Sequence, residues 1–133
     1  MAELLTEEYI RANVAKVDWS SISIEQTLSE NFIREFQDKM GWVRISHYQK
    51  LSEDFIREFQ DRVYWDYICC YQNLSENFII EFQDKVNWNA ISWRQTLSVE
   101  FIIKYQNMLN WNSVLDYQKL DQETREYLLL LKG

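Results

Sequence analysis

The sequence contains no proline and only two glycines, Gly41 and Gly133. Tight turns between short β-strands usually need these two residue types, so their scarcity disfavours an all-β fold. Two isolated glycines also cannot form a glycine-rich loop that cradles phosphate groups. The longest apolar runs, residues 67–71 and 127–131, are far too short to span a bilayer. We therefore expect a protein without β-sheets, nucleotide loop or membrane segment.

Cysteine and positive charge are scarce as well. The only cysteines, Cys69 and Cys70, are adjacent and do not match a zinc-ligand spacing, so we expect free thiols in a reducing compartment. The first twenty residues contain no apolar block typical of a secretory signal, which favours a cytoplasmic protein. The net charge of −7 disfavours direct binding to nucleic acid, because such binding depends on Lys and Arg neutralising phosphates.

A segment that repeats every 23 residues makes up nearly the whole chain. Five repeats cover residues 5–27, 28–50, 51–73, 74–96 and 97–119, followed by a shorter final segment, residues 120–133. A fixed period of this size is typical of a solenoid, in which each repeat buries its apolar face against its neighbours. Hydrophobic residues at 47% of the chain suffice for an ordered core. We predict one domain, residues 1–133.

The pattern inside one repeat predicts two helices. Ser29 is a suitable N-cap, and Leu28 and Ile33 have the spacing of a hydrophobic staple. Apolar residues then recur at helical spacing, which predicts a first helix over residues 30–40. A second helix of about two turns should begin at Trp42. The sequence thus predicts an all-α fold, an α-solenoid of five helix-turn-helix units with a C-terminal capping helix over residues 121–132.

The tryptophans follow the same period, and we expect them to form the structural core. They are Trp19, Trp42, Trp65, Trp88 and Trp111. On this interpretation, a Trp65→Ala substitution should cost about 3–5 kcal/mol, as for a buried aromatic side chain.

Polar residues recur at fixed positions too. Acid-first i,i+4 pairs, such as Glu30 with Arg34 and Glu35 with Lys39, are expected to stabilise the first helix of each repeat. Glutamines recur in two columns: 37, 60, 83 and 106, and 26, 49, 72, 95 and 118. An amide placed identically in every repeat can bond backbone groups left over at helix ends, so we predict a ladder of amide bonds between repeats.

The consensus L-S-E-x-F-I-x-E-F-Q-D-K-V-x-W-x-x-I-S-x-Y-Q resembles short tandem repeats in uncharacterised proteins of large DNA viruses, phages and some bacteria. The resemblance extends from residue 5 to about residue 120 and implies no particular activity. For a viral protein, it implies a location inside the host cell.

The residue types present give little support for catalysis. His47 is the only histidine, and no carboxylate or cysteine recurs beside it as a partner. Paired acids such as Glu35 with Asp38 recur in three repeats, which is typical of a structural ridge. We therefore expect no enzyme, no cofactor and no metal site.

Positions that vary between repeats are better candidates for binding, because folding explains those that recur. On the second helix, the variable positions share one face and include residue types common at interaction hot spots. The predicted protein-binding residues are Arg44, His47, Tyr67, Cys70, Trp93 and Arg94. We expect a non-enzymatic repeat module that binds a partner protein through this stripe.

Two other functions remain open. An acidic face could imitate a phosphate backbone, as in a viral or phage inhibitor of a host nucleic-acid enzyme. Alternatively, the protein could assemble with itself, because the final helix is apolar on more than one face. The predicted self-association residues are Leu128, Leu129, Leu130 and Leu131.

Overall fold

The computed structural model describes residues 4–132, and these residues form eleven α-helices and no strand. The predicted all-α solenoid of helix pairs is confirmed. The helices group into two compact parts, an N-terminal part up to Gln72 and a C-terminal part from Asn73. Residues 1–3 of the predicted domain and Gly133 of the predicted cap lie outside the described residues. The single domain over residues 1–133 stays a prediction.

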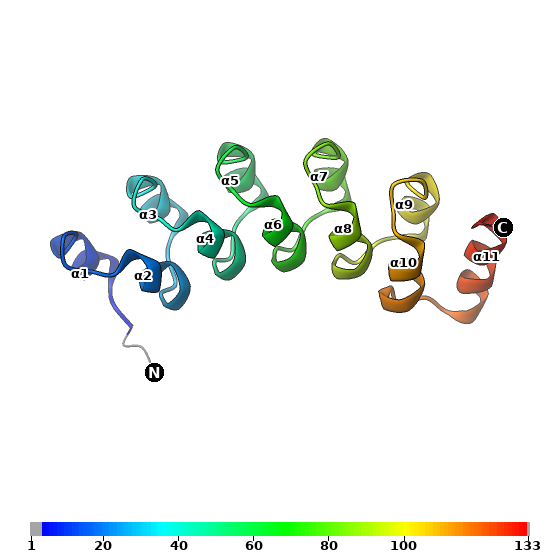
Figure 1. Ribbon diagram of the computed structural model, residues 1–133, viewed down its shortest axis with the longest axis horizontal. Helices are drawn as coiled ribbons and strands as arrows, with labels where there is room; N and C mark the ends of the chain where they lie inside the picture. Colours follow the sequence, from blue (N-terminus) through cyan, green and yellow to red (C-terminus); the bar gives the residue numbers. More distant parts are fainter. Residues whose placement is uncertain (1–3, 133) are drawn as a thin grey trace. The chain divides into compact units, whose positions relative to one another are not determined.

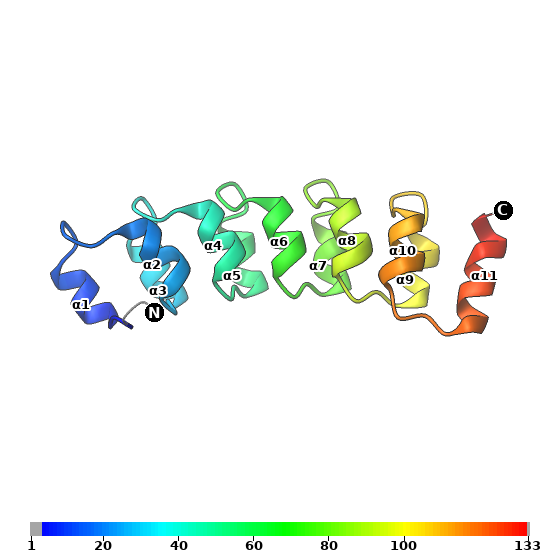
Figure 2. The same ribbon diagram turned by 60° about the horizontal axis from the view of Figure 1, so that its bottom comes forward.

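The N-terminal part contains the first three repeats, each built from one six-residue helix and one seven-residue helix. They are α1 (Glu7–Ala12), α2 (Trp19–Glu25), α3 (Glu30–Glu35), α4 (Trp42–Tyr48), α5 (Glu53–Glu58) and α6 (Trp65–Tyr71). The odd-numbered helices line one side of this part, and α2, α4 and α6 lie side by side on the other (Figures 1 and 2).

The C-terminal part continues the pattern for two repeats and ends on a longer helix. Its helices are α7 (Glu76–Glu81), α8 (Trp88–Arg94), α9 (Val99–Lys104), α10 (Trp111–Tyr117) and α11 (Gln122–Lys132). The predicted capping helix is confirmed as α11. Its Leu128 side chain is fully buried, and Arg125 donates to the carbonyl oxygen of Leu115 in α10.

The predicted helix caps are confirmed at the start of every first helix. The side-chain oxygen accepts from the backbone N–H three residues later; the Ser29 hydroxyl, for example, accepts from the N–H of Phe32 at 3.1 Å. Asp121 does the same for Thr124 at 2.7 Å, and hydrogen bonds from Thr124 lower the pKa of the Asp121 carboxyl. This cap therefore stabilises α11 at neutral pH and is lost as the pH falls through that lowered pKa. Gly41 and Tyr64 make no side-chain cap bond.

The prediction that the first helix reaches residue 40 is wrong. In the second repeat α3 ends at Glu35, and residues 36–39 form turns instead. The Gln37 side chain donates to the carbonyl of Arg34, and the Trp42 indole N–H donates to the carbonyl of Gln37. These side chains donate hydrogen bonds to carbonyls that would accept from backbone N–H groups if the helix continued. Met40 is still buried, because the turns carry it back to the core.

Phenylalanine and isoleucine, rather than tryptophan, occupy the centre of the core. Phe32, Phe55 and Phe78 are fully buried, as is the isoleucine that follows each of them. Trp42 is also buried, but the other four repeat tryptophans are only half-buried. The rings of Trp19, Trp42 and Trp88 lie against the phenylalanine of the next repeat, as Trp42 does with Phe55 at a centroid distance of 6.2 Å. The tryptophans therefore cover the core.

The second glutamine column forms the predicted ladder between repeats. Gln49 accepts from the N–H of Leu28 at 3.1 Å and donates to the carbonyls of Ser23 and Gln26 at 2.9 and 2.7 Å. Gln72 and Gln118 repeat all three bonds. Each of these glutamines thus forms hydrogen bonds with the start of its own repeat and with the end of the preceding repeat. The first column, by contrast, bonds carbonyls of its own repeat.

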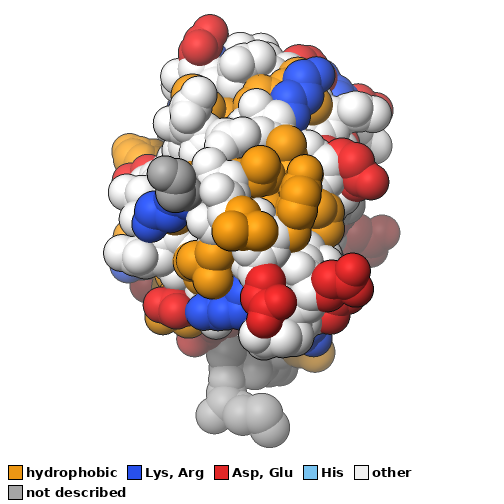
Figure 3. All heavy atoms as spheres, turned by 90° about the vertical axis from the view of Figure 1, so that its right-hand side faces the viewer, with side chains coloured by type: hydrophobic (Ala, Val, Ile, Leu, Met, Phe, Trp, Pro, Cys, Tyr) orange, Lys and Arg blue, Asp and Glu red, His pale blue; other side chains and the backbone are white. Residues whose placement is uncertain are grey.

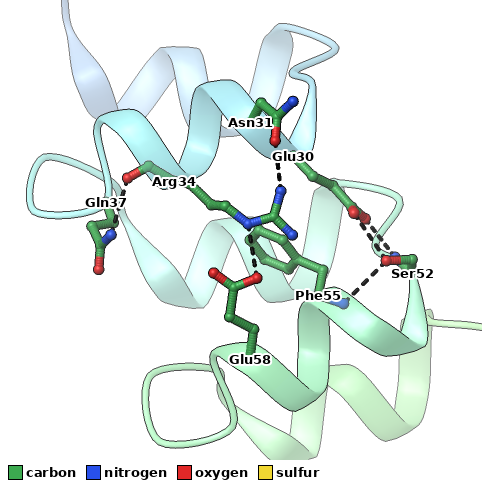
Figure 4. Close-up of polar contacts among 7 residues, drawn as sticks. All are labelled: Glu30, Asn31, Arg34, Gln37, Ser52, Phe55 and Glu58. Carbon is green, nitrogen blue, oxygen red and sulfur yellow. Dashed lines mark hydrogen bonds and ion pairs between the residues drawn. The ribbon is translucent and has the colours of Figure 1, made fainter.

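Acidic residues also form contacts between repeats, which corrects the predicted i,i+4 pairs of Glu30 with Arg34 and of Glu35 with Lys39. Glu30 accepts from the N–H and the hydroxyl of Ser52 at 2.7 and 2.9 Å (Figure 4). Arg34 pairs with Glu58 at 2.8 Å, and its guanidinium lies 5.3 Å from the centroid of the Phe55 ring. Periodicity along one helix could not reveal these partners, because they are 22 and 24 residues apart.

A Glu30→Ala substitution should lower the free energy of unfolding by about 1 kcal/mol, because Ser52 loses a charged acceptor at a site that water reaches. Chemical denaturation measures this loss. Glu25→Ala is the matched control, since Glu25 is an exposed acid at the end of α2 whose side chain makes no hydrogen bond or ion pair among the described residues. An equal loss in both variants would show that the contact with Ser52 contributes nothing specific.

Candidate functional site

In the N-terminal part, an aromatic cluster gathers at the surface of α4 and α6. The His47 ring lies between Tyr48 and Tyr71, with centroid distances of 3.9 and 3.8 Å and interplanar angles near 20°. Tyr67 completes the cluster at 5.5 Å from His47. The three tyrosines are 52%, 46% and 37% exposed in the order Tyr48, Tyr71, Tyr67. This cluster presents a stacked aromatic surface to solvent.

Only two of the four predicted residues in this part belong to the cluster. His47 and Tyr67 do, whereas Arg44 and Cys70 make no ring contact or hydrogen bond with it among the described residues. Arg44 is half-buried near Asp18, whose pKa is lowered by hydrogen bonds from Ser21 and, to a lesser degree, by the Arg44 charge. Cys70 is a half-buried free thiol.

The C-terminal part carries a related but open arrangement on α8 and α10. The Trp93 and Tyr117 rings lie 5.5 Å apart and are tilted by 53°. The Arg94 guanidinium lies 4.3 Å from the centroid of the Trp93 ring, within the range of a cation–π contact. Both predicted residues of this part, Trp93 and Arg94, therefore lie together.

A pocket of about 240 Å³ lies beside these rings. Besides Trp93, Arg94 and Tyr117, its lining includes Thr96 and Lys119. Two of the lining side chains are cations and none is an acid, although the whole chain has a net charge of −7. At the corresponding positions of the second and third repeats, the stacked rings of His47, Tyr48 and Tyr71 lie in contact instead.

Reasoning from sequence missed Tyr48, Tyr71 and Tyr117. All three occupy the last position of the second helix, where tyrosine recurs in three of the five repeats. In the sequence, recurrence at a fixed position indicates a role in folding, yet these rings are among the more exposed aromatic side chains. Each of these tyrosines ends a helix and directly precedes a glutamine of the second column, and this position is the signal in the sequence that could have identified them. A recurring position can thus belong to the surface.

No group of three or more His, Cys, Asp or Glu side chains among residues 4–132 is placed to hold a metal ion. Cys69 is buried and unbridged, as predicted for the position that serine occupies in three other repeats. Within the same residues, no helix combines the length and the apolar character needed to cross a membrane.

No protein-family model, curated protein or solved structure matches the chain. The resemblance to viral, phage and bacterial repeat proteins stays a prediction.

Proposed function

We propose that this chain is a non-enzymatic, cytoplasmic repeat module that binds a partner protein through aromatic side chains at the ends of its second helices. The observation that carries the proposal is the stacked cluster of His47, Tyr48, Tyr67 and Tyr71. Three of its rings are about 40–50% exposed, and aromatic side chains of this kind dominate the energetics of protein interfaces.

Burial does not account for these rings. The position of His47 holds Ile24, Cys70, Trp93 and Asp116 in the other repeats, so the fold accepts many side chains there. Tyrosine and tryptophan supply large contact areas at low cost in side-chain entropy, which suits them to a preformed binding surface. The stacking in the cluster holds the rings in place before a partner arrives.

The pocket beside Trp93 supports an acidic segment as the partner's contact. Arg94 and Lys119 bring two positive charges to it, and no lining acid opposes them. A carboxylate on the partner would gain charge-assisted hydrogen bonds, while apolar groups beside it would pack on Trp93 and Tyr117. Binding at this pocket should therefore weaken as the salt concentration rises.

A direct test is affinity capture from a lysate of the source organism, followed by a binding measurement with the purified partner. We expect Tyr67→Ala and Trp93→Ala each to weaken binding at least tenfold, as hot-spot side chains do. Tyr64→Ala is the matched control, because Tyr64 is a tyrosine of the same part as Tyr67, is more exposed than Tyr67, and makes no side-chain cap bond. A partner that binds all four proteins equally would place the interface elsewhere.

Imitation of a nucleic-acid backbone has less support. Glu7, Glu30 and Glu76 accept hydrogen bonds from the next repeat, and Glu35, Glu58 and Asp38 pair with arginines. Carboxylates already engaged in this way do not form the free rows of negative charge that mimicry requires.

A further inference from the structure

The outer surface of α11 carries several exposed apolar side chains beside Glu123 and Glu126, unlike the polar face of a simple capping helix. Tyr127, Leu129, Leu130 and Leu131 are all exposed, and Leu130 is 79% exposed. Figure 3 looks onto the end of the chain that carries α11 and shows hydrophobic side chains gathered at the centre of the face, with charged groups around them. Terminal repeats normally need a polar outer face for solubility. Leu128, by contrast, is fully buried, so the prediction from the sequence that Leu128 takes part in self-association is wrong.

The first repeat exposes the residues that later repeats bury. Tyr9 occupies the position of Phe32 and Phe55, yet it is 52% exposed while both phenylalanines are fully buried. Leu5 corresponds to Leu28 and is likewise less buried. Tyr9 and Leu5 line an open pocket of about 340 Å³ together with Val17 and Ile22.

Contacts inside the N-terminal part show what covers such a face. Phe32 is covered by the preceding repeat, whose Trp19 ring lies 6.3 Å away and whose Arg11 guanidinium lies 5.2 Å away. Phe55 is covered in the same way by Trp42 and Arg34. The exposed face of the first repeat therefore corresponds to the surface that the preceding repeat covers in the second and third repeats.

A polar feature of α11 matches this face as well. In the first, second and fourth repeats, a glutamate at the start of the first helix accepts from the N–H and hydroxyl of the next repeat's serine. Gln122 holds the glutamate position on α11, and its amide nitrogen donates to Glu126 at 2.9 Å. Its Oε1 can accept a hydrogen bond, and Thr6 holds the serine position of the first repeat.

We propose that α11 of one copy of this chain packs against the first repeat of a second copy. In this contact, Leu129 and Leu130 cover Tyr9 and Leu5, and Gln122 faces Thr6. The contact continues the interface that joins one repeat to the next. It is heterologous, because the two copies contribute different surfaces, so each associated copy keeps one free face for a third. This proposal does not depend on the aromatic partner-binding site.

The test is sedimentation equilibrium of the purified chain over a concentration series from micromolar to several hundred micromolar. The wild type should show an apparent mass that rises with concentration beyond that of a dimer. Tyr9→Glu and the double substitution Leu129→Glu/Leu130→Glu should each remain monomeric, because each removes one of the two surfaces. Mixed in equal amounts, these two variants should form a dimer and nothing larger, since only one pair of intact faces remains.

Tyr64→Glu is the matched control, because Tyr64 is as exposed as Tyr9 but belongs neither to the first repeat nor to α11; it should associate like the wild type. Circular dichroism checks that every variant keeps its helices. A wild type that stays monomeric throughout overturns the proposal. Association of Tyr9→Glu by itself overturns it too, because α11 would then pair with α11 of the second copy. Loss of association in Tyr64→Glu would show that the effect is not specific to these faces.

Discussion

A Gln49→Ala substitution should lower the free energy of unfolding by about 3–5 kcal/mol, one of the two largest effects expected of any single change. The Gln49 side chain is buried and makes three hydrogen bonds, to the N–H of Leu28 and the carbonyls of Ser23 and Gln26. Each buried backbone group left without a partner costs about 1–3 kcal/mol, although water entering the gap recovers part of that cost. A stability of about 5–15 kcal/mol for a whole domain makes this loss severe.

Chemical denaturation measures the loss, and two further variants separate its causes. Gln49→Met keeps most of the side-chain volume but none of the amide's strong hydrogen bonds, so it should be nearly as damaging as Gln49→Ala. Gln37→Ala removes a glutamine that is only half-buried and should cost about 1 kcal/mol. If Gln49→Met restored wild-type stability, packing rather than hydrogen bonding would explain the ladder.

A Phe55→Ala substitution should cost about 3–5 kcal/mol, the usual range for removing a fully buried phenylalanine. The Phe55 ring has no exposed surface and contacts Trp42 and Phe59 at centroid distances of 6.2 and 4.6 Å. Because Trp65 is only half-buried, Trp65→Ala should cost less than Phe55→Ala, which revises the expectation from the sequence. Thermal or chemical unfolding ranks the two variants.

The same column supplies the control for this prediction. Tyr9 is the equivalent residue of the first repeat and is half-exposed, so Tyr9→Ala should change the free energy of unfolding by less than about 1 kcal/mol. If Trp65→Ala proved more damaging than Phe55→Ala, the tryptophans rather than the phenylalanines would be the centre of the core.

Features that act within one helix could be predicted from the sequence. The caps at Ser29 and its equivalents follow from residue type and from the apolar spacing after them. The second helix also begins where predicted, at Trp42. The glutamine ladder was accessible for another reason: one residue type recurs identically in every repeat, and an amide can both donate and accept.

Features that depend on how one repeat lies on the next could not be predicted. Glu30 has Arg34 one helical turn away, and this spacing alone indicates an ion pair. In the structure, Glu30 instead accepts a hydrogen bond from Ser52, and Arg34 pairs with Glu58. Both partners lie in the next repeat, so the spacing within one helix does not reveal them. Periodicity likewise extended α3 to residue 40, since apolar spacing does not distinguish a helix from the turns that Gln37 and Trp42 stabilise.

The candidate site shows the same limit. Variation between repeats identified His47, Tyr67, Trp93 and Arg94, which the structure places in two aromatic groups, one in each part. It could not identify Tyr48, because a recurring residue is buried or exposed according to which way its side chain points. Here Tyr48 and Tyr71 are exposed, while the neighbouring Gln49 and Gln72 are buried.

The central claim is that the exposed rings serve binding and not folding. The most direct measurement determines, for a Tyr67→Ala/Trp93→Ala double variant, both the free energy of unfolding and the affinity for the captured partner. Each ring contacts an aromatic neighbour, stacked for Tyr67 and tilted for Trp93, and such a pair is worth about 0.5–1.5 kcal/mol. The variant should therefore stay folded and lose less stability than Phe55→Ala does. Its affinity should fall at least tenfold. A variant that loses as much stability as Phe55→Ala but binds as tightly as the wild type would contradict the account.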